Sequence, residues 1–354
     1  DGKNGVDVPE IKETVAKIAR IPAEQITGAE TTGLKDLNGK MKKFVFDQDK
    51  AIDTLTKAVK VAKAGLREPN KPIGSYLFTG PTGVGKTEVA KQLADKMGVG
   101  YIKLDMSEYM EKHSVSRLIG SPPGYVGHDD AGQLTEAVDR NPHSVLLLDE
   151  VEKANPAVFN LLLQIMDDGK LTDSQGKTVD FSNVILIMTS NAGASDMQKP
   201  KAGFGGGTHS DADTKAVERF FTPEFRNRLD AVVPFGMLQP ETMTKIVDKF
   251  IDELKVQAAE RDIELELTEP ARQWLAKEGY DEKMGARPMK RVITKHVREP
   301  LAEEITSGEL QKGGRAKIAF NEAAAEGESP IKIKPVKRAP SPKQDLLTYQ
   351  PAKP

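Results

Sequence analysis

The chain has 354 residues, of which 29% are charged, and its formal net charge is −2. This length is sufficient for two domains with well-buried cores. The two signs of charge are interspersed without a basic stripe, so we do not expect a nucleic acid as a partner. The chain contains no cysteine, which excludes disulfides, thiolate catalysis and cysteine zinc sites and fits a cytoplasmic location. The longest apolar runs have the length of strands, so we expect no membrane span and no secretory signal.

The first part of the chain is polar, and we interpret residues 1–37 as a linker or the end of a preceding module. A helical pattern of apolar residues begins near Gly39 and ends at a proline-rich turn over 68–72. Unbroken apolar runs then alternate with helical segments; they lie at 76–78, 101–104, 145–148 and 184–188. Such strands are typical of a parallel sheet covered by helices on both faces. We therefore predict an α/β domain over residues 38–237.

The composition changes after Phe235, where we predict a smaller α+β domain over residues 238–336. Its expected helices span 240–261, 269–277 and 286–307, and its expected strands span 263–267, 316–320 and 331–334. Residues 337–354 contain four prolines and few apolar residues, which favours a disordered tail.

A phosphate-binding loop lies between the first apolar strand and the helical stretch that begins at Glu88. Its residues are Gly80, Pro81, Thr82, Gly83, Val84, Gly85, Lys86 and Thr87. Glycines allow the backbone N–H groups to approach phosphate oxygens, and the following helix presents its positive end. Lys86 would bind the β- and γ-phosphates, and the Thr87 hydroxyl would bind Mg²⁺. The loop therefore predicts binding of a nucleoside triphosphate, with ATP and Mg²⁺ expected.

Two carboxylates, Asp149 and Glu150, end the apolar strand at 145–148, where an α/β sheet places its ligands. Asp149 is suited to holding Mg²⁺ and Glu150 to polarising the attacking water. Asn191 follows the next strand and could orient that water near the γ-phosphate. An asparagine after a strand is also common as a turn or helix cap, so this motif alone leaves both interpretations open.

With these motifs in order, the chain resembles the second ATPase module of the Clp unfoldases of the AAA+ superfamily, most closely those of the ClpA type, over about residues 10 to 336. The resemblance implies that Asn191 is the first γ-phosphate sensor. It implies that Arg228 is an arginine finger reaching a neighbouring subunit, with Arg226 as the alternative. Arg287, after Ala286 in a Gly-Ala-Arg motif, would be the second sensor. A trans-acting arginine implies a homo-oligomeric ring, expected to be a hexamer.

The same resemblance makes Val45 and Phe46 the adenine-contacting segment. Asp47 stands where the family usually has glycine, which leaves the local turn open. Tyr125 and Val126 lie between Gly124 and Gly127 and resemble a pore loop that grips unfolded polypeptide substrates. An aromatic side chain suits this task because it offers apolar contact area without requiring a specific hydrogen bond. Residues 171–177 are a candidate second loop facing the same channel.

Ala202, Gly203 and Phe204 correspond to the loop with which protease-coupled Clp unfoldases dock into the ClpP peptidase. Ala202 replaces a larger aliphatic residue, which would weaken each docking contact by about 2 kcal/mol. We therefore expect an ATP-dependent unfoldase that threads polypeptide into ClpP and has no peptidase activity of its own. Two alternatives remain: a disaggregase that works without a peptidase, and a nucleotide-dependent switch or assembly ATPase.

Overall fold

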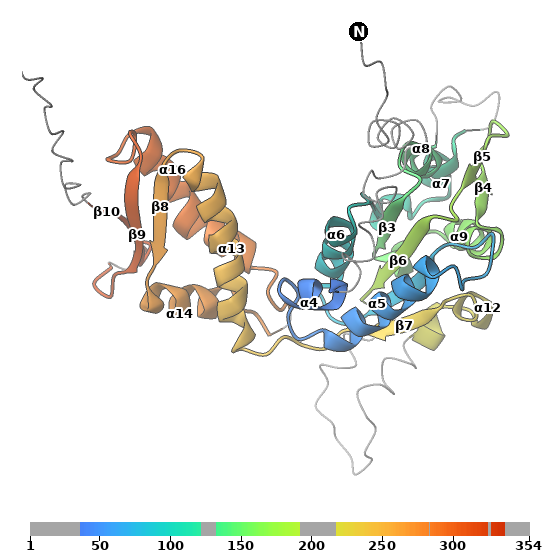
Figure 1. The fold of residues 1–354 in the computed structure, drawn as a ribbon, viewed down its shortest axis with the longest axis horizontal. Helices are drawn as coiled ribbons and strands as arrows, with labels where there is room; N and C mark the ends of the chain where they lie inside the picture. Colours follow the sequence, from blue (N-terminus) through green and yellow to red (C-terminus); the bar gives the residue numbers. More distant parts are fainter. Residues whose placement is uncertain (1–35, 122–131, 192–216, 283, 325–326, 337–354) are drawn as a thin grey trace, which may run out of the picture. The chain divides into compact units, whose positions relative to one another are not determined.

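The computed structural model describes residues 36–121, 132–191, 217–282, 284–324 and 327–336 (Figure 1). The chain divides into two compact units. The first extends to Leu238 and includes Lys283–Gly285, and the second comprises Gln239–Glu282 and the chain from Ala286 onward. The interpretations of residues 1–37 and 337–354 concern residues that lie almost entirely outside the described part of the chain. The domain limits drawn from composition stay predictions.

A five-stranded parallel sheet forms the centre of the first unit, as the apolar runs predict. Its strand order is β2-β3-β6-β1-β7. The strands are β1 (Gly74–Thr79), β2 (Gly100–Asp105), β3 (Ser144–Asp149), β6 (Val184–Ser190) and β7 (Ala231–Pro234). The chain therefore brings the ends of β3, β6 and β1 to adjacent positions at one edge of the sheet.

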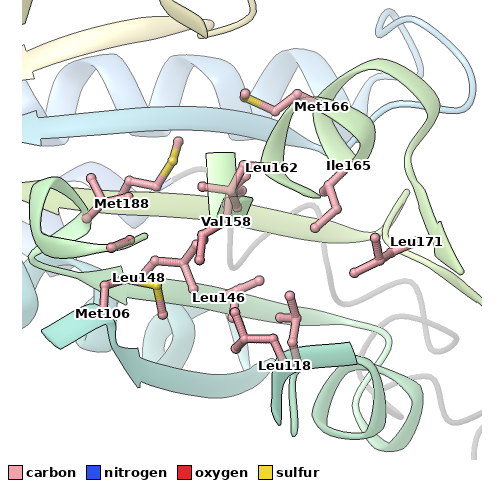
Figure 2. Packing of buried hydrophobic residues seen from close by; sticks show 14 of the residues in the cluster. Met106, Leu118, Leu146, Leu148, Val158, Leu162, Ile165, Met166, Leu171 and Met188 are labelled. Atoms are coloured by element: carbon pink, nitrogen blue, oxygen red, sulfur yellow. The ribbon is translucent and has the colours of Figure 1, made fainter. Parts of the chain in front are cut away.

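Both faces of this sheet are covered. On one face, Val145, Leu147 and Ile187 pack with apolar residues of α4 (Leu37–Lys42), α5 (Asp49–Lys63) and α6 (Lys86–Met97). On the other, Leu146 and Leu148 belong to a cluster with α7 (Lys112–Ile119), α8 (Gln133–Arg140) and α9 (Pro156–Asp168). Figure 2 shows Val158 and Leu162 of α9 above Leu146 and Leu148 of β3. Burial on both faces explains why these strands read as continuous apolar runs.

The expected second channel loop at 171–177 is mostly a short hairpin. Its strands are β4 (Lys170–Thr172) and β5 (Thr178–Asp180), which pair antiparallel. Asp173 closes the turn, because its Oδ1 accepts hydrogen bonds from the N–H groups of Gln175 and Lys177 at 2.9 and 2.8 Å. The N–H of Ser174 donates to the carbonyl of Ile119 at 2.9 Å, so the turn is attached to the end of α7.

The second unit is α+β, as predicted. Its helices α13 (Thr242–Ala259) and α14 (Glu269–Glu278) accompany a sheet of order β10-β9-β8. Strand β9 (Gly314–Phe320) pairs parallel with β8 (Ile263–Leu267) and antiparallel with β10 (Ile331–Val336). Among the described residues, no helix combines the length and apolar character that a bilayer span requires.

The helix predicted over 286–307 is present over residues 289–306, but it contains a π-helical turn. The chain forms α15 (Met289–Ile293), a π-helical turn η3 (Thr294–Arg298) and α16 (Glu299–Thr306). Pro300 lies in the first turn of α16 and has no N–H to donate to the preceding turn. A π-helical turn is one way in which a helix adjusts its hydrogen bonds at such a position.

Candidate nucleotide site

The predicted phosphate loop connects the interior strand β1 to α6, which begins at Lys86. Three of its glycines, Gly80, Gly83 and Gly85, have φ values of 129°, 78° and 102°. These conformations are open to glycine but strained for other residues. A Cβ atom on Gly80 would lie 2.4 Å from the carbonyl oxygen of Phe235, so this position also requires glycine for space.

Lys86 is buried, with 7% of its surface exposed. Its Nζ atom donates hydrogen bonds to the carbonyl oxygens of Gly80 and Pro81, the latter at 2.8 Å, and to Oδ1 of Asn191 at 2.8 Å. Burial lowers the pKa of Lys86 to about 8, and the negative charges of nearby carboxylates oppose this shift. The loop thus holds a desolvated amine that additional anionic oxygens would stabilise in its charged form.

Asp149 lies at the end of β3 beside the start of α6. Its Oδ2 atom is 3.5 Å from Oγ1 of Thr87 and 2.7 Å from Nζ of Lys103, and its Oδ1 accepts a hydrogen bond from Oγ1 of Thr189. A hydroxyl and a carboxylate oxygen fit Mg²⁺, which binds proteins through few ligands and retains substrate phosphates and waters. In the described part of the chain, no group of three or more His, Cys, Asp or Glu residues could hold a metal unaided.

Glu150 adopts a left-handed backbone conformation, with φ of 56° and ψ of 48°. Its N–H donates to Oγ1 of Thr189 at 3.0 Å, its Oε1 accepts from Nδ2 of Asn191 at 3.2 Å, and its Oε2 pairs with Lys153. Such conformations are uncommon outside glycine and concentrate at functional sites. Because its hydroxyl also bonds Asp149, Thr189 contacts both acidic residues and holds them in position. The sequence motifs did not reveal this role.

Asn191 follows β6, which lies between β1 and β3 in the sheet. This position places its amide between Lys86 and Glu150, with one hydrogen bond to each. Its side chain is thus engaged with the phosphate-loop lysine and the predicted water-activating carboxylate. Its assignment as a γ-phosphate sensor stays a prediction.

The predicted adenine-contacting segment is attached to the phosphate loop. Val45 is buried and Phe46 half-buried, and Asp47 adopts the left-handed conformation with φ of 59°. The chain thus makes the turn with aspartate where the family pattern suggests glycine. The buried Gln48 donates through Nε2 to the carbonyls of Val84 and Gly236 at 3.3 and 3.0 Å. It therefore connects this segment to the loop.

The two candidate arginine fingers, Arg228 and Arg226, contact other acidic residues. The Nε atom of Arg228 is 3.1 and 3.2 Å from the two carboxylate oxygens of Asp167, and NH1 of Arg226 is 3.0 Å from Glu218. None of these acidic partners belongs to the group around Lys86. Ala286 and Arg287 belong to the second unit, so their predicted place in the nucleotide site stays a prediction.

The remaining predicted site residues lie outside the described residues. Tyr125 and Val126 fall within 122–131, and Ala202, Gly203 and Phe204 fall within 192–216.

A phosphate loop after β1, an acidic pair after β3 and an asparagine after the intervening strand define a P-loop ATPase of the AAA+ class. Residues 71–232 match the family described as "AAA domain (Cdc48 subfamily)". Residues 238–318 match the "C-terminal, D2-small domain, of ClpB protein".

Individual proteins that are similar to this chain belong to one family within this class of ATPases. The chain is 56% identical to "ClpA homolog protein" of Fuscovulum blasticum over 348 residues, covering 98% of this chain and 44% of that protein. It is 48% identical to "Negative regulator of genetic competence ClpC/MecB" of Bacillus subtilis, covering 87% of this chain and 39% of that protein. It is 46% identical to "Chaperone protein ClpB" of Propionibacterium freudenreichii, covering 91% of this chain and 38% of that protein. The chain belongs to the Clp family of AAA+ ATPases, which confirms the resemblance, and it spans about two fifths of these relatives' length.

Proposed function

We propose that this chain is an ATP-hydrolysing module that unfolds and translocates polypeptides as one subunit of a homo-oligomeric ring. The observation that carries the ATPase part is the placement of Asn191 between Lys86 and Glu150, with Asp149 and Thr87 beside them. These are the groups that triphosphate hydrolysis requires: a cation, a candidate base, a polar orienting group and two oxygen ligands for Mg²⁺.

Each group has a distinct role in this proposal. Lys86 binds the β- and γ-phosphates in place of its present carbonyl acceptors, and Thr87 and Asp149 hold Mg²⁺, which neutralises phosphate charge when bound. Glu150 accepts a proton from the attacking water, and Asn191 keeps that water and the γ-phosphate in line. The backbone N–H of Glu150 is fixed by Thr189, so the carboxylate is held in place before the substrate binds.

The position of Arg228 supports the proposed ring. Arg228 is paired with Asp167 and not with the phosphate-loop group of its own subunit, which fits a guanidinium that serves a neighbouring site. We propose a hexamer, as the family resemblance implies, with Arg287 and Ala286 of the second unit completing the nucleotide site. Val45, Phe46 and the loop from Gly80 to Thr87 bind the remainder of ATP.

We assign Tyr125 and Val126 to the channel through which polypeptide would pass, and we propose that the module acts in the cytoplasm. The proposed partner is the ClpP peptidase, bound through Ala202, Gly203 and Phe204. One relative, from Staphylococcus epidermidis and 45% identical over 333 residues, is named "ATP-dependent Clp protease ATP-binding subunit ClpC". Its name supports coupling to a peptidase.

A peptidase-independent disaggregase is the second candidate. The small-domain match and several similar relatives carry the name ClpB, which is described as a chaperone. Sequence identities of 46 to 48% to ClpB and ClpC proteins do not separate the two functions.

The test measures ATP-dependent degradation of a folded, tagged protein by ClpP in the presence of this chain. We expect degradation with the unchanged chain, retained ATPase activity but no unfolding with Tyr125→Ala, and unfolding without degradation with Phe204→Ala. Unfolding by the unchanged chain without any effect of ClpP would favour the disaggregase. Unchanged unfolding by Tyr125→Ala would remove that residue from the channel.

A further inference from the structure

Glu152 contacts the site although no motif assigns it a role there. It lies on the 3₁₀ turn η2 (Val151–Lys153), two residues after Glu150. Its Oε1 atom accepts a hydrogen bond from the backbone N–H of Asn191 at 2.9 Å. Since β3 and β6 are neighbours in the sheet, this bond joins the turn that follows one strand to the first residue after the other.

This bond holds the backbone of Asn191, which lies beyond the last residue of β6 that is paired in the sheet. The pairing of β6 with β1 ends at Ser190, opposite Thr79, and its pairing with β3 ends at Met188. The N–H of Asn191 therefore points to the Glu152 carboxylate beyond the last paired residue. A hydrogen bond to a charged acceptor is roughly twice as strong as one between neutral groups, so it is suited to orienting this residue.

The second carboxylate oxygen of Glu152 lacks a compensating hydrogen bond. Oε2 is shielded from solvent and has no hydrogen-bond partner among the residues that the structure describes. A buried oxygen of this kind is energetically unfavourable, and such a group in a native protein calls for an explanation. Among the acidic neighbours that oppose the lowered pKa of Lys86, Glu152 has the largest effect, ahead of Asp149 and Glu150. Its charge is thus directed toward the phosphate loop.

We propose that Glu152 is a positioning residue that holds the backbone of Asn191 so that the Asn191 amide faces Lys86 and Glu150 together. Glu152 itself does not touch the phosphates or the attacking water. Without its bond, the Asn191 side chain would rotate away from one of its two partners, and the γ-phosphate would lose a fixed contact. The inference rests only on the ATPase part of the proposed function, and failure of polypeptide threading would leave it untouched.

The experiment compares Glu152→Ala with Glu152→Gln in the full chain. It measures Tm, the kcat and KM of ATP hydrolysis, and the ratio of the affinities for a non-hydrolysable ATP analogue and for ADP. For Glu152→Ala we expect losses of about tenfold in kcat and in the preference for the triphosphate, with ADP affinity nearly unchanged. Glu152→Gln keeps a carbonyl oxygen to accept from Asn191 and should restore most of both values. Glu108→Ala, which removes an exposed carboxylate from the neighbouring turn η1 (Met106–Tyr109), is the control and should change neither.

A double-mutant comparison with Asn191→Ala identifies the residue through which Glu152 acts. If Glu152 positions the Asn191 amide, Glu152→Ala should lower the triphosphate preference only while that amide is present. Equal further losses in the Asn191→Ala background would overturn the proposal. So would a lowered Tm with an unchanged affinity ratio, which defines a merely structural role, or equal impairment by Glu152→Gln and Glu152→Ala. The affinity ratio needs no hydrolysis, so the test holds even where the chain turns over slowly.

Discussion

The Nζ atom of Lys86 donates a hydrogen bond to Oδ1 of Asn191 at 2.8 Å and thereby links the phosphate loop to the end of a strand 105 residues later in the chain. Among the described residues, the lysine donates hydrogen bonds to two carbonyl oxygens of its own loop and to this amide oxygen. A triphosphate would compete for the same ammonium. Phosphate oxygens should therefore replace the two carbonyl acceptors of Lys86, while the Asn191 amide keeps its contacts with Lys86 and Glu150.

The first prediction concerns the protonation of Lys86 when nucleotide binds. Burial lowers the pKa of Lys86 to about 8 from 10.5, so a large part of the population is neutral near pH 9. Phosphate oxygens favour the charged form, so nucleotide binding should take up a proton at about pH 9 and almost none at about pH 6.5. Titration calorimetry in buffers of different ionisation enthalpy measures this uptake directly.

Lys86→Arg is the matched control, because a guanidinium stays charged throughout this range. The variant should bind without proton uptake at either pH. The same shift makes a stability prediction: between pH 8 and 10.5 the unfolded chain binds more protons at residue 86 than the folded chain, so the Lys86 contribution to the free energy of unfolding rises with pH there. Equal proton uptake by Lys86→Arg would assign the effect to another group.

Thr189 is the subject of the second prediction. Its hydroxyl donates to Asp149 and accepts from the N–H of Glu150 at 3.0 Å, so Thr189→Val removes both bonds while keeping the shape of the side chain. We expect a loss of about 1–3 kcal/mol in the free energy of unfolding and a raised Mg²⁺ requirement for hydrolysis. Urea denaturation and Mg²⁺ titrations of the ATPase rate measure these effects. Thr189→Ser keeps the hydroxyl and should stay close to the unchanged chain; equal defects in both variants would mean that the methyl group matters instead.

Motifs predicted the parts of this site that have fixed sequence spacing. The phosphate loop, Asp149 and Glu150 each follow an apolar strand, and the ends of parallel strands meet at one edge of a sheet. Thr189 and Glu152 gave no such signal. Their contacts depend on β6 lying beside β3, and a single sequence does not specify that strand order. The structure shows that residues 171–177 include the turn between β4 and β5, and their place in a channel stays a prediction.

The third prediction concerns three glycines and distinguishes the cost of backbone strain from the cost of a steric clash. Gly80→Ala adds a Cβ atom 2.4 Å from the carbonyl oxygen of Phe235 at a φ of 129°. Gly85→Ala has a φ of 102° in open space. Gly236→Ala has no positive φ, and no heavy atom lies within 4 Å of its Cβ position. We expect losses in unfolding free energy of about 3 kcal/mol or more, about 1–2 kcal/mol and less than about 0.5 kcal/mol in that order. Denaturant midpoints measure the series. A similar loss at Gly80 and Gly85 would mean that Phe235 moves aside at little cost.

The last prediction tests whether Arg228 acts on a neighbouring subunit. Its guanidinium is paired with Asp167 and Glu224 of its own chain, and these ion pairs are partly exposed to solvent, so Arg228→Ala should still fold. Loss of a finger should lower the ATPase rate of the assembled ring by about 10³-fold.

Glu150→Gln should bind ATP without hydrolysing it. In mixed rings, a Glu150→Gln subunit supplies an intact Arg228 to the intact Glu150 of an Arg228→Ala neighbour, so mixing two inactive variants should restore part of the activity. No recovery on mixing, with assembly verified by sedimentation, would place Arg228 in its own subunit's site or outside hydrolysis, and the same mixture made with Arg226→Ala tests the alternative finger.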